Sequence, residues 1–480
     1  MATIRRDGHT TLRLNMHIRR STLTLLLLLA PSIFSSLATA DDRPNVLFLF
    51  ADDQRPDSIA ALGNSVIKTP NLDVLARRGF VFRNTYCMGS TVGAVCNPSR
   101  HMTLSGMSLY RYDGKKKEDT WGDVFRKAGY VTYHQSKRGN TAREYHKAFE
   151  YSSYLTDNGE RKSGYHGRAA ANNAIEFLND TWDRDKPLFM YVGFAGPHDP
   201  RVAADEWMKL YKRSEIQLPK NYQPFHPIDN NWMTGRDEAL APWPRTEEVV
   251  RRHLHDYYAC ISSIDHHIGR IIATLKELGE YDNTIVIFSA DHGLAVGSHG
   301  LFGKQNLYEH SMRSPMIFAG PGIEKGESDA LMYLFDIFPT SCDLAGLKAP
   351  KGIEGRSVGP VIRREEDSHR ETIFLSYQKG QRAVRRGDWK LYRFPLVNYS
   401  MLFNLAEDPH ELHSLADDSK HADRLRLMTN LLAKQQQIWN DTQPLTSDNP
   451  SAAKVTDVSF FSDPRNQVKS GKKKKRQKTK

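Results

Sequence analysis

Cys96 stands at the start of the stretch whose residue types could do the most demanding chemistry. Pro98 follows it closely, and proline is favoured in the first turn of a helix. The Cys96 thiol would then lie at a helix N-terminus, where unpaired backbone N–H groups favour an anion. Arg100 adds a permanent charge whose planar fork suits a tetrahedral oxyanion. Residues 96–100 therefore predict a place that binds and attacks a sulfate or phosphate ester.

Three apolar stretches each end in ionisable residues. They are residues 45–51 before Asp52 and Asp53, residues 283–290 before Asp291 and His292, and residues 188–194 before His198. Unbroken apolar runs of this length predict strands that are buried on both faces, as in a parallel sheet. Ligand sites in such sheets form at the carboxyl ends of the strands. The three endings therefore predict one common site.

The residues at two of these strand ends have the character of metal ligands. Asp52 and Asp53 are adjacent carboxylates, which repel each other unless a cation lies between them. Asp291 adds a third carboxylate and His292 a nitrogen. Hard oxygen ligands suit Ca²⁺ or Mg²⁺ better than zinc. Taken singly, the aspartates would be a solvated turn and His292 a strand-end histidine bonded to backbone, so the prediction rests on the group.

The stretch Cys96-Asn97-Pro98-Ser99-Arg100, continued by Leu104-Ser105-Gly106, resembles the C-x-P-S-R signature of the type I sulfatases, members of the alkaline-phosphatase superfamily. In that family a formylglycine-generating enzyme oxidises the cysteine to formylglycine, whose hydrate is the nucleophile. The resemblance implies that Cys96 is so modified. It also implies a divalent cation, expected to be Ca²⁺ with Mg²⁺ as the alternative, held by Asp52, Asp53, Cys96, Asp291 and His292.

Further matches carry the resemblance along the chain. Residues 69–79 resemble a T-P-N-x-D-x-L-A-x-x-G segment of sulfatases, and residues 291–304 resemble D-H-G-x-x-x-G-x-H-G-x-x-x-K. The resemblance implies that Arg100, Lys137 and Lys304 neutralise the sulfate oxygens. His198 is the candidate that protonates the leaving alcohol.

One departure from the family pattern follows Lys137. Sulfatases have a histidine two or three residues beyond this lysine, whereas this chain has Gly139 and Asn140 there. Either Asn140 substitutes for that histidine, or His134 or His146 folds into its place. The sequence leaves these alternatives open.

The resemblance implies an α/β fold in which a large mixed, mostly parallel sheet is flanked by helices, followed by a small C-terminal α+β subdomain. End signals predict helices over residues 70–79 and 121–127, and hydrophobic spacing predicts helices over 247–279 and 424–439. Short antiparallel strands are expected near 383–385, 389–392 and 402–405. Residues 200–250 have no clean period, which predicts a long insertion at the mouth of the site. The expected division is a catalytic domain over 41–370, the subdomain over 371–445 and a disordered basic tail over 446–480.

The two ends of the chain account for its net positive charge. Of the net +11, residues 1–40 carry +4 and residues 469–480 carry +8, which leaves the remainder at −1. The basic character is therefore no sign of a nucleic-acid partner. Arg19-Arg20, the apolar residues 23–30 and Ala38-Thr39-Ala40 predict a signal peptide over 1–40, cleaved near Ala40, and so a secreted or periplasmic enzyme. The apolar run is too short to span a membrane.

The four cysteines are too few for a disulfide scaffold, and once Cys96 is modified at most one bridge could form. The predicted activity is a sulfuric ester hydrolase acting on a sulfated carbohydrate or an aryl sulfate. Two alternatives stay open at this point. One is a phosphodiesterase or phosphonate hydrolase of the same superfamily. The other is an inactive relative that binds sulfated glycans, which the missing histidine and the basic tail would suit.

Overall fold

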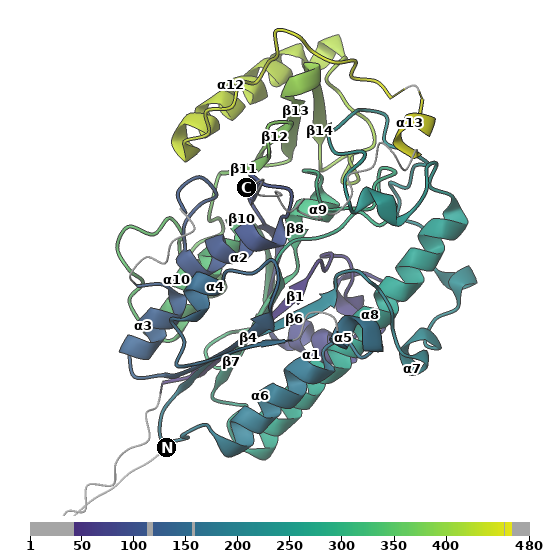
Figure 1. Ribbon diagram of the computed structural model, residues 1–480. Helices are drawn as coiled ribbons and strands as arrows, with labels where there is room; N and C mark the ends of the chain where they lie inside the picture. The colour runs from purple at the N-terminus through teal and green to yellow at the C-terminus, as the bar shows by residue number, and fades with distance from the viewer. Residues whose placement is uncertain (1–42, 113–118, 156–158, 456, 463–480) are drawn as a thin grey trace, which may run out of the picture. The chain divides into compact units, whose positions relative to one another are not determined.

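The computed structural model of the protein describes residues 43–112, 119–155, 159–455 and 457–462 (Figure 1). The predicted signal peptide over residues 1–40 and the basic segment 469–480 lie outside these described residues. Among the helices of the described ranges, none combines the length and apolar composition that crossing a membrane requires.

A nine-stranded sheet forms the centre of the fold, in the order β10-β2-β9-β7-β1-β6-β4-β5 with β8 paired to β2. All its strand pairs are parallel except those of β8 and β9. The predicted mixed, mostly parallel sheet is thus confirmed. The bounds are β1 Asn45–Asp52, β2 Phe80–Tyr86, β4 Val131–Lys137, β5 Tyr151–Leu155, β6 Leu188–Pro197, β7 Thr284–Ala290, β8 Arg313–Ser314, β9 Met316–Ala319 and β10 Gly326–Tyr333.

Strand β1 shows why the central apolar runs of the sequence are unbroken. Its residues alternate between two hydrophobic cores, so Phe48 and Phe50 belong to one core while Leu47 and Leu49 belong to the other. Every residue of the strand is buried. Because neither face of this strand meets solvent, the side chains on both faces are apolar, and the sequence shows an unbroken apolar run.

Helices cover both faces of the sheet (Figure 1). The core with Leu47 includes residues of α1 Pro70–Arg78, α6 Arg168–Asp180 and α8 Glu247–Glu277, and the core with Phe48 includes residues of α2 Cys96–Ser105, α3 Trp121–Lys127 and α10 Ile337–Leu344. The remaining short helices are α4 Arg143–His146, α5 Gly159–Ser163, α7 Asp205–Met208, α9 Glu309–Met312, α11 Gly359–Ile362 and α13 Ser459–Ser462.

A second, five-stranded sheet carries the C-terminal part of the described chain. Its order is β14-β13-β12-β11-β3, and it is antiparallel except where β11 pairs with β3. Helix α12, Ala422–Trp439, contacts β12 and β13. The bounds of the strands are β3 Gly89–Ser90, β11 Thr372–Tyr377, β12 Gln381–Arg386, β13 Trp389–Phe394 and β14 Tyr399–Asn404. Strand β3 joins this sheet from the segment that leads to Cys96.

Residues 446–455 correct part of the predicted disordered tail. Asp229 donates its backbone N–H to the carbonyl of Ala453 over 2.8 Å, and Val455 donates to Pro227 over 2.9 Å. Because these bonds tie the segment to the insertion 200–250, it is ordered in spite of its polar composition. Residues 463–480 lie outside the described part of the chain.

The structure gives no disulfide among the four cysteines. Cys87, Cys96, Cys260 and Cys342 are all free and buried. Between residues 200 and 246 the structure has α7 and two single 3₁₀ turns but no strand, and α8 begins at Glu247.

His226 gives the fold a predicted sensitivity to acid. It is fully buried, and its Nδ1 lies 2.5 Å from the carbonyl oxygen of Ile228 while its Nε2 lies 2.9 Å from the hydroxyl of Tyr308. Burial lowers the pKa of His226 to about 4, so the unfolded chain takes up the proton more readily than the folded one. We therefore expect this histidine alone to lower the free energy of unfolding by about 3 kcal/mol as the pH falls from about 6.5 to about 4.

Urea unfolding across this pH range checks the expectation. The variant His226→Gln should show a flatter loss of stability below pH 6.5 than the wild type. His413→Gln, at an exposed position, is the matched control and should keep the wild-type slope. An unchanged slope in His226→Gln would contradict the assignment.

Candidate active site

Three sequence-distant segments bring the candidate residues to the carboxyl edge of the central sheet. Strand β1 ends in Asp52, and Asp53 follows with φ +69°, a left-handed conformation that turns the chain sharply at the strand end. Strand β7 runs parallel to β1 and leads into Asp291 and His292. Cys96 is the first residue of α2, as the sequence predicts.

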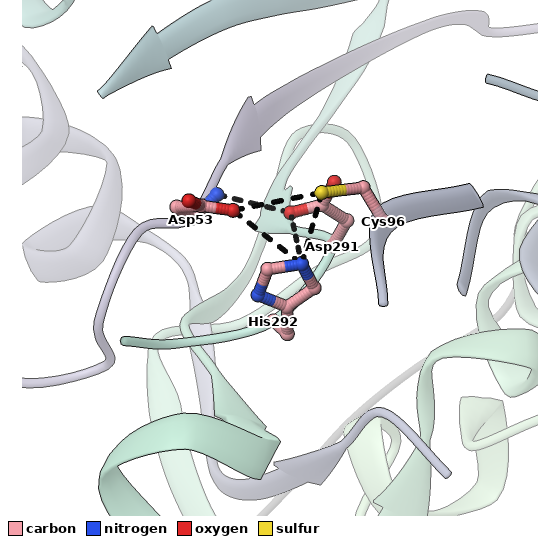
Figure 2. Close-up of side chains that lie close together, drawn as sticks. All are labelled: Asp53, Cys96, Asp291 and His292. Atoms are coloured by element: carbon pink, nitrogen blue, oxygen red, sulfur yellow. Dashed lines mark hydrogen bonds and ion pairs between the residues drawn. The ribbon is translucent and has the colours of Figure 1, made fainter. Parts of the chain in front are cut away.

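Asp53, Cys96, Asp291 and His292 form a compact group, and one ligand atom from each lies within 4.8 Å of all the others. Figure 2 shows the four side chains pointing toward one another. The Nε2 atom of His292 lies 3.3 Å from Cys96 Sγ, 3.4 Å from Asp53 Oδ1 and 3.6 Å from Asp291 Oδ1. Asp53 also donates its backbone N–H to Asp291 Oδ1 over 3.0 Å. All four are buried, so they are a candidate cation site.

Asp52 lies beside this group rather than in it. It forms ion pairs with Lys137 and, at 3.8 Å, with Arg100 Nη2. Burial alone would raise the pKa of Asp52, but Lys137 and then Arg100 outweigh it and hold that pKa well below its usual range. Its Oδ1 accepts no hydrogen bond from any described residue. One oxygen of Asp52 is therefore available to a cation.

Lys304 provides the second cation of the site. Its Nζ donates to Asp53 Oδ1 over 2.9 Å and to Asp53 Oδ2 over 2.7 Å, and it lies 3.7 Å from Asp237 Oδ2. Burial would lower the pKa of Lys304, but Asp53 and the other negative groups around the lysine together outweigh burial and raise that pKa well above the ordinary value. The side chain is therefore a fixed positive charge against the candidate cation site.

Arg100 is fully buried and ties α2 to the sheet. Its Nε donates to Asp291 Oδ2 over 3.1 Å, and its Nη1 donates to Ser136 Oγ over 3.0 Å. The bond to Ser136 reaches β4, whose last residue is Lys137. Arg100 thus fixes the geometry between the strand ends and the helix that begins at Cys96.

Cys96 is only 1% exposed. Burial, and then the negative charge of Asp52, raise the pKa of its thiol well above the ordinary value. The group is thus a neutral thiol at pH 7, and the thiolate is the nucleophilic form of a cysteine.

His198 reaches the site from the end of β6. Its Nδ1 lies 2.8 Å from the carbonyl oxygen of Asp199 and 3.1 Å from Arg161 Nη1, while its Nε2 lies 3.9 Å from Asp53 Oδ2. Burial lowers the pKa of His198, although Asp53 opposes the shift. The ring therefore presents Nε2 to the site and anchors Nδ1 on the outside.

A cavity of ≈ 540 Å³ opens onto these residues. Among the predicted site residues, Cys96, Lys137, His198 and Lys304 line it directly. Its remaining lining residues are Gly93, Ala94, Gly139, Asn140, Arg161, Trp232, Arg236, Asp237 and Gln305. Its volume suits a ligand the size of a small sugar or aryl ester.

The structure separates the three candidates for the missing histidine. His134 and His146 stack on each other with ring centroids 3.6 Å apart and bond through Nδ1 to Ser152 and Tyr154. Neither lines the cavity, whereas Asn140 does, with φ +46°. Of the three alternatives, Asn140 is therefore the one placed at the cavity.

Sequence reasoning missed the residues at the outer side of the cavity. Trp232, Arg236 and Asp237 come from the insertion 200–250, and Arg161 comes from α5. Arg236 donates to Asp199 Oδ1 over 2.8 Å and to Asp237 Oδ1 over 2.6 Å. The insertion has no periodic pattern, so only the prediction that it lies at the mouth of the site pointed to these residues.

Comparisons with known proteins give the family. The sulfatase family model matches residues 44–347, which is more than half of the chain. A second model, described as the C-terminal part of N-sulphoglucosamine sulphohydrolase, matches residues 297–438. The first match covers the central sheet and the site described above, and the second covers β11 to β14 of the C-terminal sheet.

Individual relatives agree with the family match. The chain is 27% identical over 467 residues to an arylsulfatase of Clostridium perfringens, covering 82% of this chain and 94% of that protein. It is 25% identical over 521 residues to an N-acetylglucosamine-6-O-sulfatase of Bacteroides thetaiotaomicron, covering 88% and 92%. A solved structure of a protein with its substrate D-glucosamine-2-N,6-O-disulfate shares the fold with a TM-score of 0.70 at 22% identity, covering 85% of this chain and all of that one. The chain belongs to the sulfatase family and is a hydrolase of sulfate esters.

Proposed function

We propose that this sulfatase hydrolyses a sulfated carbohydrate by means of a formylglycine at position 96 and a bound divalent cation, with Ca²⁺ preferred and Mg²⁺ as the alternative. The observation that carries the proposal is the convergence of Asp53, Cys96, Asp291 and His292 within 4.8 Å, next to Lys304. A buried group of carboxylates that is open to a cavity on one side is the arrangement that a cation and an anionic ester would share.

The donor set fits a hard divalent cation. Asp53, Asp291 and the unbonded Oδ1 of Asp52 supply carboxylate oxygens, and His292 supplies a nitrogen. When bound, such a cation polarises an oxygen of the ester and stabilises the charge that develops on it. Lys137 and Lys304 neutralise the negative charge that reaches the remaining sulfate oxygens, and Arg100 fixes the strand ends on which they depend.

The residue at position 96 would supply the attacking group. A formylglycine-generating enzyme would convert the Cys96 side chain to an aldehyde before the chain folds, because the folded protein leaves that side chain only 1% exposed. The hydrated aldehyde offers a hydroxyl where the thiol now lies, 3.6 Å from Asp53 Oδ1. His198 presents its Nε2 to the same space and is the candidate that protonates the leaving alcohol.

A carbohydrate substrate is supported by the relatives and by the cavity. Several relatives are named for sulfated sugars, among them the N-acetylglucosamine-6-O-sulfatase and a ulvan-active sulfatase of Formosa agariphila. The cavity of ≈ 540 Å³ has room for a sugar ring beside the sulfate, and Trp232 at its wall offers an aromatic surface. The predicted signal peptide supports export to the periplasm or the cell exterior, where the enzyme would encounter sulfated polysaccharides.

The mass of the tryptic peptide Asn84–Arg100, from protein made in its native host, tests the nucleophile. We expect the Cys96 side chain to have lost its sulfur and gained an aldehyde oxygen, while Cys87 in the same peptide keeps its thiol and serves as the internal control. An intact Cys96 in a host able to make the modification would overturn the formylglycine proposal.

Parallel assays with an aryl sulfate and an aryl phosphate measure selectivity on the same preparation. We expect sulfate release to be the faster reaction. A faster aryl phosphate reaction would instead favour a phosphodiesterase or phosphonate hydrolase. Binding of a sulfated glycan with no turnover would favour the inactive relative.

A further inference from the structure

Six side chains, four of which line the cavity, form a closed ring in which negative groups alternate with cationic or imidazole groups. Lys304 Nζ lies 2.7 Å from Asp53 and 3.7 Å from Asp237, and Arg236 Nη1 lies 2.6 Å from Asp237 and 2.8 Å from Asp199. His198 closes the ring, 3.2 Å from Asp199 and 3.9 Å from Asp53. Asp53 and Arg236 lie on opposite sides of the ring, with two residues between them in either direction. Asp53 is the ring member that contacts Cys96. The ring therefore links the reacting end of the cavity to an outer end at Arg236.

These contacts hold Arg236 in place but do not use all of its N–H groups. Asp199 and Asp237 engage three of its five N–H groups in hydrogen bonds. Within the described residues, two N–H groups are left, and 43% of the side chain is exposed. Two buried carboxylates thus fix the guanidinium plane beforehand, so a ligand that binds its remaining N–H groups loses little conformational entropy.

Two further residues complete the outer end. Arg161 Nη1 donates to the carbonyl oxygen of Asp199 over 2.7 Å and lies 3.1 Å from His198 Nδ1, so it is attached to the same ring. Trp232 is fitted between two glycines, because a Cβ at Gly93 would lie 3.2 Å from its ring and a Cβ at Gly235 only 2.0 Å from it. A side chain at either glycine would crowd the indole, so the two glycines allow Trp232 to lie at the cavity wall.

Most of the charged side chains that line the cavity are cationic. The lining includes Lys137, Arg161, Arg236 and Lys304 but only one carboxylate, that of Asp237. The two lysines lie at the inner end, where each is less than 5% exposed and pairs with Asp52 or Asp53. Arg161 and Arg236 lie at the outer end, away from the place where a single sulfate would lie against the lysines.

We propose that Arg161 and Arg236 form a second anion subsite, which binds a further negatively charged group of the substrate while the sulfate to be cleaved lies at Cys96. The inference rests on the proposed function and narrows its substrate class to a carbohydrate with at least two anionic groups. The second group is a sulfate or a carboxylate, since both match the fork of an arginine. Trp232 packs against the sugar between them.

Binding to the full-length Cys96→Ala protein tests the proposal without turnover, by calorimetry. Two matched ligand pairs separate the two sources of the second anion. One pair is a monosulfated and a disulfated glucosamine, and the other is a monosulfated disaccharide with a free uronate and its uronate methyl ester. We expect the additional anionic group to tighten binding at least about 10-fold in one of the pairs, as a charge-assisted hydrogen bond to arginine does.

The variants Arg161→Gln and Arg236→Gln should each remove most of this 10-fold preference, and Arg236→Lys should keep part of it. The measured quantity is the ratio of the affinities for the two ligands of a pair. A variant that weakens the binding of both ligands equally leaves this ratio unchanged. Arg426→Gln, on the exposed surface of α12, is the control and should keep the ratio. If one glutamine variant does not fold, the other and Arg236→Lys still carry the test.

Three results would overturn the subsite. They are equal affinities within both pairs of ligands, a preference that survives in both glutamine variants, and a loss of affinity that is equal for the two members of a pair. The last would mean that the arginines only position His198. Failure of the proposed function is a separate outcome, because it appears as absent sulfate release by the enzyme with Cys96, whereas the subsite is measured by binding alone.

Discussion

Replacing Lys304 with alanine is expected to lower kcat/KM for a sulfate ester by about 10²- to 10³-fold, the loss seen when one preorganised donor to a developing anion is removed. Lys304 is buried, lines the cavity and is held by Asp53 over 2.7 Å. If it acts on charge that appears in the transition state, kcat and kcat/KM should fall together. Steady-state release of sulfate, measured with saturating and limiting ester, separates the two quantities.

Lys209→Ala is the control, because that lysine is on the surface of the insertion with 77% of its side chain exposed. It should retain the wild-type rate. Circular dichroism and the unfolding temperature of Lys304→Ala show whether the site is damaged more widely. A well-folded Lys304→Ala protein with the wild-type kcat would remove the lysine from the mechanism.

The second large effect is expected for Asp291→Asn. Asp291 Oδ1 belongs to the four-residue group, and its Oδ2 accepts from Arg100 Nε over 3.1 Å. An amide cannot supply a negative oxygen to both a cation and Arg100, so we expect the variant to lose its stoichiometric metal and at least about 10³-fold in activity. Metal content by mass spectrometry after dialysis is a readout that does not depend on turnover.

Asp282→Asn makes a close control. Asp282 is exposed and precedes β7, whereas Asp291 follows the same strand. The control should keep both metal and activity. An Asp291→Asn protein that binds as much metal as the wild type would show that the cation lies elsewhere, even if the activity is lost.

The strand ends that carry this site could be predicted from the sequence because burial on both faces demands an unbroken apolar run. The predicted strand over residues 45–51 became β1, and those over 188–194 and 283–290 became β6 and β7. Parallel pairing then sets Asp52 beside Pro197 and Ala51 beside Ala290, which explains why endings far apart in sequence meet. The helix beginning at Cys96 followed from Pro98 in the same way.

The outer half of the site could not be predicted, for two physical reasons. Arg236 and Asp237 lie in a segment without hydrophobic periodicity, so no pattern fixed their position relative to Asp199. Arg161 lies on a five-residue helix, too short to show a period. For Asp52, the sequence predicted the position at the strand end. It did not predict the ion pair with Lys137, which depends on how β1 and β4 are placed in the sheet.

The pairing of β3 with β11 has a consequence for the order of events during synthesis. Ser376 lies opposite Gly89, and Tyr377 lies opposite Ser90, so the approach to Cys96 is an edge of the C-terminal sheet. Contacts this distant in sequence close late, because the loop between them must be ordered first. Until the ribosome has delivered residues 372–377, β3 has no partner strand in this sheet. For the proposed modification of Cys96, we therefore expect the time available to the modifying enzyme to depend on how fast residues 97–377 are translated.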